Sequence, residues 1–203
     1  MDSQTLAVYN QQAHAIAVRH LAYGETPTHF GLQLLAYFWS GEPTADIGAG
    51  GGRDSHWLHQ QGFPLVGYDG SEGMLAEARR LYPECDFRYA LLPHLSEIPS
   101  DTYTNVLCSF VLMHLPFDEL PLAIHHLARI LKPTGRLIVA FRPSKTESDR
   151  EDDGRLFTPI SLEHMQEWMT AADLQVLESE TRQNKAEPVS HWHFVVAERL
   201  PHP

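Results

Sequence analysis

Four glycines in five positions follow a short apolar run that ends in an acid, in the stretch TADIGAGGGRDSHW at residues 44–57. One or two glycines suffice for a tight turn, whereas these four remove side chains from a whole stretch of backbone. The residues before the glycines have a strand-like pattern, and those after them have a helical one. Such a turn between a strand and a helix predicts a ligand that approaches the backbone closely.

Length and composition indicate one domain. The chain has 203 residues, of which 43% are hydrophobic, enough for one substantial core. No uninterrupted apolar run approaches the ~18 residues of a membrane span, and the N-terminus lacks the basic and apolar regions of a secretory signal. Cys85 and Cys108 both lie in strand-like stretches, which favours buried thiols in a cytoplasmic protein over a disulfide framework.

Apolar segments without alternation are followed by amphipathic ones along most of the chain. The pattern predicts strands at 43–47, 64–69, 86–91, 104–112 and 136–141, and helices at 4–22, 27–39, 53–61, 71–82, 118–131 and 161–172. Residues 174–183 and 191–200 are expected to close the fold as an antiparallel pair. The chain is therefore expected to form a doubly wound α/β sheet, with its ligand at the carboxyl ends of the strands.

The residues around the glycines indicate which ligand is bound. A dinucleotide-binding G-x-G-x-x-G motif that started at Gly48 would need a glycine at position 53, where Arg53 stands, and the Gly-Lys-Ser/Thr of a phosphate loop is absent. Asp46, just before the turn, would repel an anion. Asp69 closes the second strand, where a carboxylate can accept hydrogen bonds from both ribose hydroxyls. The turn therefore favours a ribose and a cationic group over a pyrophosphate.

Several blocks in a fixed order resemble the class I S-adenosylmethionine-dependent methyltransferases. They are D-x-G-x-G-x-G at 46–52, VGYD at 66–69, SEGMLAEAR at 71–79, NVLCSFVLMHLP at 105–116 and HHLARILKPTGRLIVAF at 125–141. The resemblance implies a seven-stranded, mostly parallel sheet of order 3-2-1-4-5-7-6, with the last strand antiparallel and helices on both faces. It further implies one domain over 1–203, made of a helical lid (1–40), a cofactor-binding half (41–141) and an acceptor-side half (142–203).

The resemblance also implies S-adenosylmethionine as cofactor, and it assigns binding positions to the chain. These positions are Asp46, Gly48, Ala49, Gly50, Gly52, Asp69, Gly70, Met74, Leu91, Leu92, Ser109 and Phe110. Among them, Asp46 would face the ammonium group of the cofactor, and Asp69 would hold the ribose hydroxyls. Gly70 and Met74 would flank the adenine, while Ser109 and Phe110 would line the wall near the sulfonium.

Three departures from the family pattern affect this site. Ala90 and Leu91 stand where the family often has Gly-Asp, so adenine recognition is expected to rest on backbone groups and on packing by Leu91 and Leu92. A buried charge-assisted hydrogen bond lost in this way is worth ~1.5–3 kcal/mol. Thr104 replaces the aspartate that usually opens the fourth strand, and Thr134 replaces a glycine of the K-P-G-G turn.

His114, just past the fourth strand, is the candidate general base, because a histidine there can accept a proton from a hydroxyl, thiol or amine. The alternative is that it only packs or caps the loop. Tyr9 and Asn10 match a pair that in related enzymes lies over the cofactor as a lid. An ordinary amphipathic helix explains these two residues equally well.

Arg142, Ser144 and Arg155 belong to a polar stretch that in this family often borders the acceptor, where two arginines can clamp a carboxylate. A solvated, salt-bridged loop is the alternative interpretation. No metal centre is expected, because no cysteine or carboxylate at a characteristic spacing joins the His125–His126 or His191–His193 pairs.

The acceptor is expected to be a small molecule. A net charge of -11 disfavours a broad nucleic-acid-binding face, and the Pro-Pro motif of DNA amino-methyltransferases is absent after the fourth strand. No membrane partner is expected, and the oligomeric state stays open. The sequence thus predicts a methyltransferase acting on a small acceptor at O, N, S or C. A non-catalytic protein that binds S-adenosylmethionine or S-adenosylhomocysteine, and a nicotinamide-dependent oxidoreductase, remain as alternatives.

Overall fold

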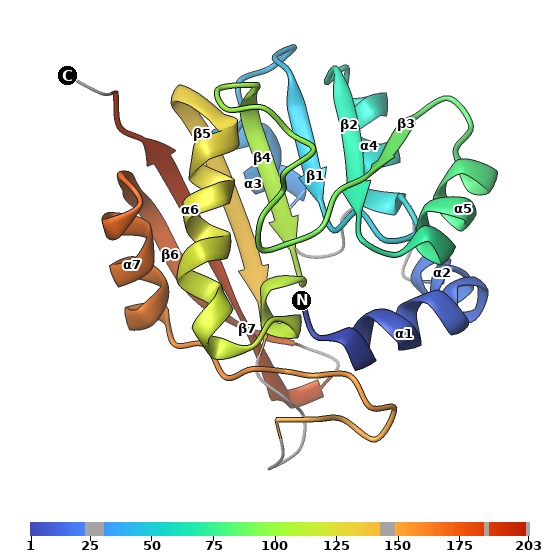
Figure 1. The fold of residues 1–203 in the computed structure, drawn as a ribbon. Coiled ribbons are helices and arrows are strands. Elements are labelled where there is room, and N and C mark those ends of the chain that lie inside the picture. Colours follow the sequence, from blue (N-terminus) through green and yellow to red (C-terminus); the bar gives the residue numbers. More distant parts are fainter. Residues whose placement is uncertain (23–30, 143–148, 185–186, 202–203) are drawn as a thin grey trace.

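The structure is a computed structural model that describes residues 1–203 except 23–30, 143–148, 185–186 and 202–203. In this described part, the strands form one seven-stranded sheet of order β3-β2-β1-β4-β5-β7-β6 (Figure 1). The strands are β1 (Thr44–Ile47), β2 (Leu65–Asp69), β3 (Asp86–Tyr89), β4 (Tyr103–Ser109), β5 (Leu131–Phe141), β6 (Leu174–Asn184) and β7 (Glu187–Arg199). The α-helices are α1 (Ser3–Gln11), α2 (Ala13–Leu21), α3 (Gly31–Tyr37), α4 (Arg53–Gln60), α5 (Glu72–Leu81), α6 (Leu120–Ile130) and α7 (Leu162–Ala171).

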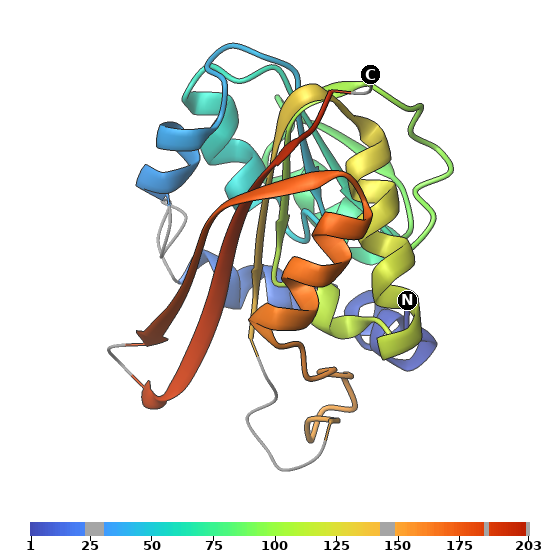
Figure 2. The same ribbon diagram turned by 90° about the vertical axis from the view of Figure 1, so that its left-hand side faces the viewer.

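The strand pairing confirms the predicted topology. β1 pairs in parallel with both β2 and β4, β3 pairs in parallel with β2, and β5 pairs in parallel with β4. β7 runs antiparallel to β5 on one side and to β6 on the other. The β6–β7 hairpin extends past the ends of the parallel strands (Figure 2).

Helices cover both faces of the sheet, and the strands contribute alternate side chains to the two cores. Along β4, Val106 and Cys108 pack in the core that includes residues of α6 and α7, whereas Leu107 packs in the core that includes residues of α3 and α4. Both faces of such a strand are buried, which explains why its sequence is apolar without alternation.

Several predicted elements differ from those observed. The strand predicted at 136–141 begins at Leu131, which pairs with Tyr103 of β4. The helix predicted at 4–22 is two helices, α1 and α2, which meet at Gln12 (φ −106°, ψ 14°). The strand predicted at 104–112 ends at Ser109 because Phe110 has φ +57° and a short 3₁₀ turn follows at Leu112–His114. Residues 27–30 of the helix predicted at 27–39 lie outside the described residues.

The N-terminal helices lie across the carboxyl ends of the parallel strands (Figure 1). Asp2 caps α1 by accepting from the Thr5 N–H at 2.8 Å, and Arg150 donates to the same carboxylate at 2.9 Å. Asn10 accepts from the Ser71 hydroxyl at 2.8 Å, at the start of α5. These contacts hold α1 over the end of the sheet. In the described part of the chain, no helix has the length and hydropathy to cross a membrane.

Candidate active site

A cavity of about 670 Å³ lies at the carboxyl ends of β1, β2 and β4. Its wall brings together the glycine turn, the end of β2, residues 90–92 and 109–114, the N-terminal helices and part of the segment 142–157. The sequence-predicted residues in this wall are Tyr9, Gly48, Ala49, Gly50, Asp69, Gly70, Leu91, Leu92, Ser109, Phe110, His114, Arg142 and Arg155. Asp46, Gly52, Met74 and Asn10 do not line it, and Ser144 lies outside the described residues.

The glycines of the turn serve two structural purposes: some allow close packing, and one keeps the cavity open. Gly48, Gly50 and Gly52 all have positive φ, at +78°, +56° and +83°. A Cβ on Gly48 would lie 2.2 Å from Val111 Cγ2, and one on Gly52 would lie 2.6 Å from Phe87 Cζ. These two positions therefore need glycine for packing. A Cβ on Gly50 would meet only Met74 Cε, at 3.7 Å, so Gly50 keeps the cavity side of the turn open.

Asp69 ends β2 in the cavity wall, where its carboxylate is oriented by the backbone. One oxygen accepts from the Gly50 N–H and the other from the Ser71 N–H, each at 2.8 Å. Desolvation raises the pKa of this carboxyl above its ordinary value, against the effect of the backbone donors. A carboxylate oxygen can accept more than one hydrogen bond, so Asp69 keeps acceptor capacity for a ligand in the cavity.

The structure places Asp46 behind the turn instead of in the cavity wall. Its side chain is only 2% exposed and accepts from the Ser55 hydroxyl of α4 at 2.6 Å. Burial, together with the nearby Asp54 carboxylate, raises the pKa of Asp46 to about 7. The acid next to the turn that does line the cavity is Asp54, in the first turn of α4.

Met74 and Asn10 support the wall without being part of it. Met74 is fully buried and packs with Ala13 and Ile16 of α2, so it fixes the lid helices against α5. Asn10 accepts from the Gly73 N–H at 3.0 Å as well as from the Ser71 hydroxyl. Both residues hold the N-terminal helices in place.

Tyr9 and His114 form a hydrogen-bonded pair in the cavity wall. The Tyr9 hydroxyl lies 3.0 Å from His114 Nε2, and His114 Nδ1 lies 2.6 Å from the Leu156 carbonyl oxygen. A carbonyl only accepts, so Nδ1 carries the proton and Nε2 accepts from the Tyr9 hydroxyl. Burial lowers the pKa of His114 to about 4, which keeps the imidazole neutral at physiological pH.

Arg142 and Arg155 line the cavity, and both are salt-bridged, as the alternative interpretation of the polar stretch expects. That they border the acceptor stays a prediction. Arg142 Nη1 lies 2.9 Å from a Glu151 oxygen, and Arg155 Nη2 lies 2.8 Å from an Asp153 oxygen. Arg155 also donates to the Tyr9 hydroxyl at 3.2 Å. The Arg142 guanidinium lies 4.0 Å from the centre of the Phe157 ring. The arginines are thereby positioned at the wall with most of their charge compensated.

A second basic group, which the sequence analysis missed, lines the cavity beside the glycine turn. It consists of Arg19 and His20 of α2 and Arg53 of α4. Burial and the charges of Arg53, Arg19 and Arg155 lower the pKa of His20 to about 4. Arg53 is paired with its neighbour Asp54 at 2.8 Å. Within the described residues, Arg19 has no hydrogen bond or ion pair, so it offers a cation to a ligand.

Aromatic side chains form much of the remaining wall. Phe157 and Trp192 line the cavity together with Phe110, whose ring lies 6.1 Å from that of Trp192. Trp192 comes from β7, far along the chain from the glycine turn, and no local pattern marks it as a site residue. By contrast, Arg53 and Asp54 directly follow the glycines, and their position there was a usable signal.

The comparisons with known proteins agree with this geometry. The model of a family described as "Methyltransferase domain" matches residues 45–139. A protein of Alkaliphilus oremlandii (strain OhILAs) that is called an uncharacterized methyltransferase is 29% identical over 98 residues. That alignment covers 48% of this chain and 44% of the relative, so the chain matches less than half the length of this curated protein.

Solved structures resemble the chain over almost its full length. The 1,6-didemethyltoxoflavin-N1-methyltransferase of Burkholderia thailandensis, solved with 1,6-didemethyltoxoflavin and S-adenosylhomocysteine, has a TM-score of 0.77 at 17% identity and covers 98% of this chain and 88% of its own. A chain from the Haloferax volcanii complex between the Trm112 methyltransferase activator and a methyltransferase has a TM-score of 0.76 at 17% identity, over 96% of this chain and 98% of its own. The TM-scores show that the fold is shared, and at 17% sequence identity the likeness shows the fold alone.

Proposed function

We propose that this chain, whose residues 45–139 match a methyltransferase domain and whose sheet has the class I strand order, transfers a methyl group from S-adenosylmethionine to a small-molecule acceptor. One observation carries the proposal: a single cavity joins a side-chain-free turn and an oriented carboxylate to a buried tyrosine–histidine pair. The first two features suit a nucleoside cofactor, and the third suits an acceptor that loses a proton.

The cavity suits the cofactor in size and in the side chains that line it. Its volume of about 670 Å³ lies within the ~300–1,000 Å³ of typical small-ligand sites. Gly50 leaves the turn open, Asp69 supplies the carboxylate for the ribose hydroxyls, and Leu91 and Leu92 supply apolar surface for the adenine. Arg19 supplies a cation for the carboxylate of the methionine part. When bound, the cofactor provides an electrophilic methyl group on a sulfonium.

The protein's own part in the reaction is alignment and proton handling. Phe110, Phe157 and Trp192 exclude water from the wall on the acceptor side, which favours an in-line approach of the acceptor atom. The Tyr9 oxygen can take a proton from the acceptor as its own proton passes to His114 Nε2, while the His114 Nδ1–H stays on the Leu156 carbonyl. Tyr9 is thus the group that touches the acceptor, and His114 acts through it.

Support for a small acceptor comes from the N-terminal helices, which lie across this end of the sheet. The N-terminal helices are fixed over it by Asn10 and by the Asp2–Arg150 pair. With the cofactor bound, the space left in a cavity of about 670 Å³ would suit a small acceptor. A cytoplasmic location is part of this proposal, in keeping with the two free cysteines.

The first test is calorimetric titration of the protein with S-adenosylmethionine and S-adenosylhomocysteine, with NADH as the control ligand. We expect micromolar binding of the first two and no binding of NADH. Asp69→Asn should weaken both by roughly ten- to a hundredfold, the equivalent of a charged hydrogen bond worth ~1.5–3 kcal/mol. The matched variant Asp86→Asn, an exposed acid on β3, should bind as the native chain does. If neither adenosyl ligand binds, the methyltransferase proposal fails.

A second experiment separates catalysis from mere binding. S-adenosylhomocysteine release is measured against a pool of small metabolites, first with the native chain and then with Tyr9→Phe. Release that depends on the pool and falls in the variant supports the enzyme. Tight cofactor binding without release against any acceptor class would instead favour the non-catalytic binding protein.

A further inference from the structure

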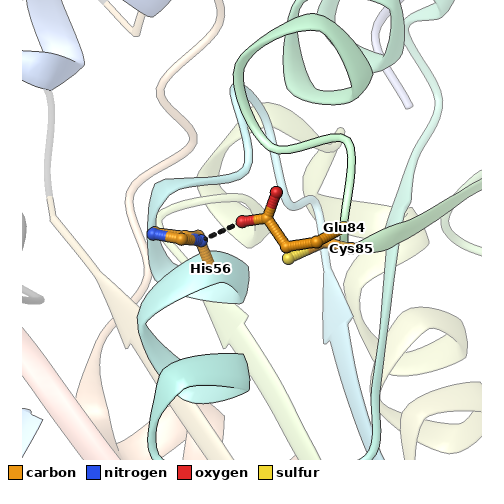
Figure 3. Close-up of side chains that lie close together, drawn as sticks. All are labelled: His56, Glu84 and Cys85. Carbon is orange, nitrogen blue, oxygen red and sulfur yellow. Dashed lines mark ion pairs between the residues drawn. The ribbon is translucent and has the colours of Figure 1, made fainter.

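His56, Glu84 and Cys85 bring a nitrogen, an oxygen and a sulfur donor together outside the cavity (Figure 3). His56 belongs to α4, whereas Glu84 and Cys85 are neighbours in the turn between α5 and β3. Their ligand atoms all lie within 4.8 Å of one another. Among the residues that the structure describes, they are the only group of three or more His, Cys, Asp or Glu side chains whose ligand atoms lie this close together.

The His56 ring is held in one orientation. It stacks on Tyr82 with ring centres 4.3 Å apart and planes 15° apart, and its Nε2 lies 2.9 Å from the Gln60 amide nitrogen. A metal-binding histidine donates its second N–H to an acceptor, a role that the Gln60 side chain fills once its amide is turned over so that the oxygen faces Nε2. The ring therefore presents Nδ1 to Glu84 and Cys85 in a fixed direction.

His56 Nδ1 is a buried polar atom without a well-directed partner. It is closed to solvent and makes no hydrogen bond of acceptable geometry, although a Glu84 oxygen lies 2.7 Å away. Buried polar atoms are almost always satisfied. Once its proton has moved to Nε2, this ring nitrogen, which faces a carboxylate and a thiol, is suited to a cation that all three can share.

We propose that His56, Glu84 and Cys85 bind a borderline-soft divalent cation of the Zn²⁺ type. Binding forms metal–nitrogen, metal–oxygen and metal–sulfur bonds, releases the thiol proton to solvent and moves the imidazole proton from Nδ1 to Nε2. The Gln60 amide then turns its oxygen toward Nε2–H. Water fills the fourth position.

The adjustment that binding requires is small. Metal–ligand distances of ~2.0–2.3 Å place tetrahedral donors about 3.3–3.8 Å apart. The His56–Glu84 contact of 2.7 Å therefore has to open by less than about one ångström, and the wider pairs, at up to 4.8 Å, have to close by about as much. The Glu84 side chain is 44% exposed and lies in a turn, so it can move. Burial raises the pKa of the Cys85 thiol to about 11, and the need to displace that proton limits the affinity.

The cation would tie α4 to the turn before β3, directly behind the glycine turn. Tyr82 and Phe87 flank this turn and lie against Gly52, with Phe87 Cζ 2.6 Å and Tyr82 Cδ2 3.1 Å from where its Cβ would be. The cation would therefore stabilise this half of the domain without entering the cavity. Sequence spacing could not reveal the site, since its residues come from two separate segments.

The test uses the tag-free, metal-stripped chain, titrated calorimetrically with Zn²⁺ and followed by absorption with Co²⁺. We expect one cation per chain and a thiolate-to-cobalt charge-transfer band in the near ultraviolet. Cys85→Ser should abolish the band. His56→Gln and Cys85→Ser should each weaken Zn²⁺ binding tenfold or more, whereas the controls His59→Gln, on the exposed face of the same helix, and Cys108→Ala should not.

Thermal unfolding guards against variants that merely disturb the fold. Zn²⁺ should raise the Tm of the native chain and should leave the Tm of Cys85→Ser unchanged, each compared with its own metal-free sample. The proposal is overturned if no cation binds, if Zn²⁺ binding is equal in all variants, or if Co²⁺ binds without the charge-transfer band. Either of the latter two results would assign the cation to other histidines of the chain.

Discussion

The Tyr9 hydroxyl and His114 Nε2 lie 3.0 Å apart, although the two residues are separated by 105 positions in the chain. Arg155 donates to the same hydroxyl at 3.2 Å, and the Leu156 carbonyl oxygen lies 2.6 Å from His114 Nδ1. The N-terminal helix, the loop after β4 and the segment before α7 thus share one hydrogen-bonded chain. Within this chain of contacts, the Tyr9 phenol lines the cavity and has a histidine nitrogen within hydrogen-bond distance.

Tyr9→Phe removes this proton path and keeps the ring. General acid–base catalysis contributes about 10²–10⁴-fold, so kcat should fall by that order with the acceptor found in the screen, while the cofactor Kd stays within about threefold. Because burial holds the pKa of His114 near 4, kcat/KM should show no inflection near the ordinary histidine pKa. Tyr89→Phe, on the exposed face of β3, serves as the control. Unchanged kcat in Tyr9→Phe would contradict a role in proton transfer.

Gly50→Ala and Gly41→Ala compare two glycines of similar backbone geometry. Both have positive φ, +56° and +74°, and neither would bring its Cβ closer than 3.7 Å to another atom. Each substitution should therefore cost a similar ~1–2 kcal/mol of stability from backbone strain. Of these two glycines, Gly50 lines the cavity and Gly41 does not. We expect calorimetry to show a loss of S-adenosylhomocysteine affinity in Gly50→Ala alone; equal affinities in the two variants would reduce the turn to a structural feature.

Arg19→Gln tests which part of the ligand the basic group recognises. S-adenosylhomocysteine carries the methionine carboxylate, and 5′-methylthioadenosine lacks it. The native chain should bind the first more tightly, and Arg19→Gln should reduce that preference by about three- to tenfold, as expected for a partly exposed charged hydrogen bond. Affinity for 5′-methylthioadenosine should not change.

Two results would speak against this assignment of Arg19. If the native chain binds both ligands equally, the carboxylate is not recognised, although the cofactor site stands. If Arg19→Gln alters KM for the acceptor alone, the arginine serves the acceptor. Arg80→Gln, on α5 and outside the cavity, controls for the change of net charge.

Most of the fold was predictable because its signals are local. The apolar runs that end at Ile47, Asp69 and Ser109 are buried on both faces of the sheet, and their order fixes a parallel arrangement. The break at Gln12 was not predictable, since no glycine or proline marks it. It depends on α2 packing against α5 through Ala13, Ile16 and Met74.

Without the family resemblance, which indicated Tyr9, His114 and Arg155, the site was predictable where the backbone alone determines position. Asp69 and Gly50 follow their strands directly, so their placement comes with the topology. Arg19 and Trp192 reach the cavity through tertiary packing of α2 and of the β6–β7 hairpin, which leaves no trace in spacing. For Asp46 the sequence predicted the position beside the turn but not the direction of the side chain, because the hydrogen bond from Ser55 of α4 orients its carboxylate.

Asp46→Asn should change the pH dependence of stability in a defined direction. The pKa of Asp46 is raised to about 7 from its ordinary value near 3.8, chiefly by burial. Between these values the folded chain binds more protons than the unfolded chain, so the contribution of Asp46 to stability is lost as pH rises toward 7 and stays lost above it. Asparagine has no such proton and still accepts from Ser55. The unfolding free energy of the native chain minus that of the variant should therefore fall by roughly 2–3 kcal/mol between pH 5 and pH 8.

Urea titrations of Asp46→Asn and of the native chain at both pH values measure this difference. The contributions of the histidines with lowered pKa cancel in it, because both chains carry the same histidines. A native-minus-variant difference that stays constant between the two pH values would mean that Asp46 ionises normally despite its burial.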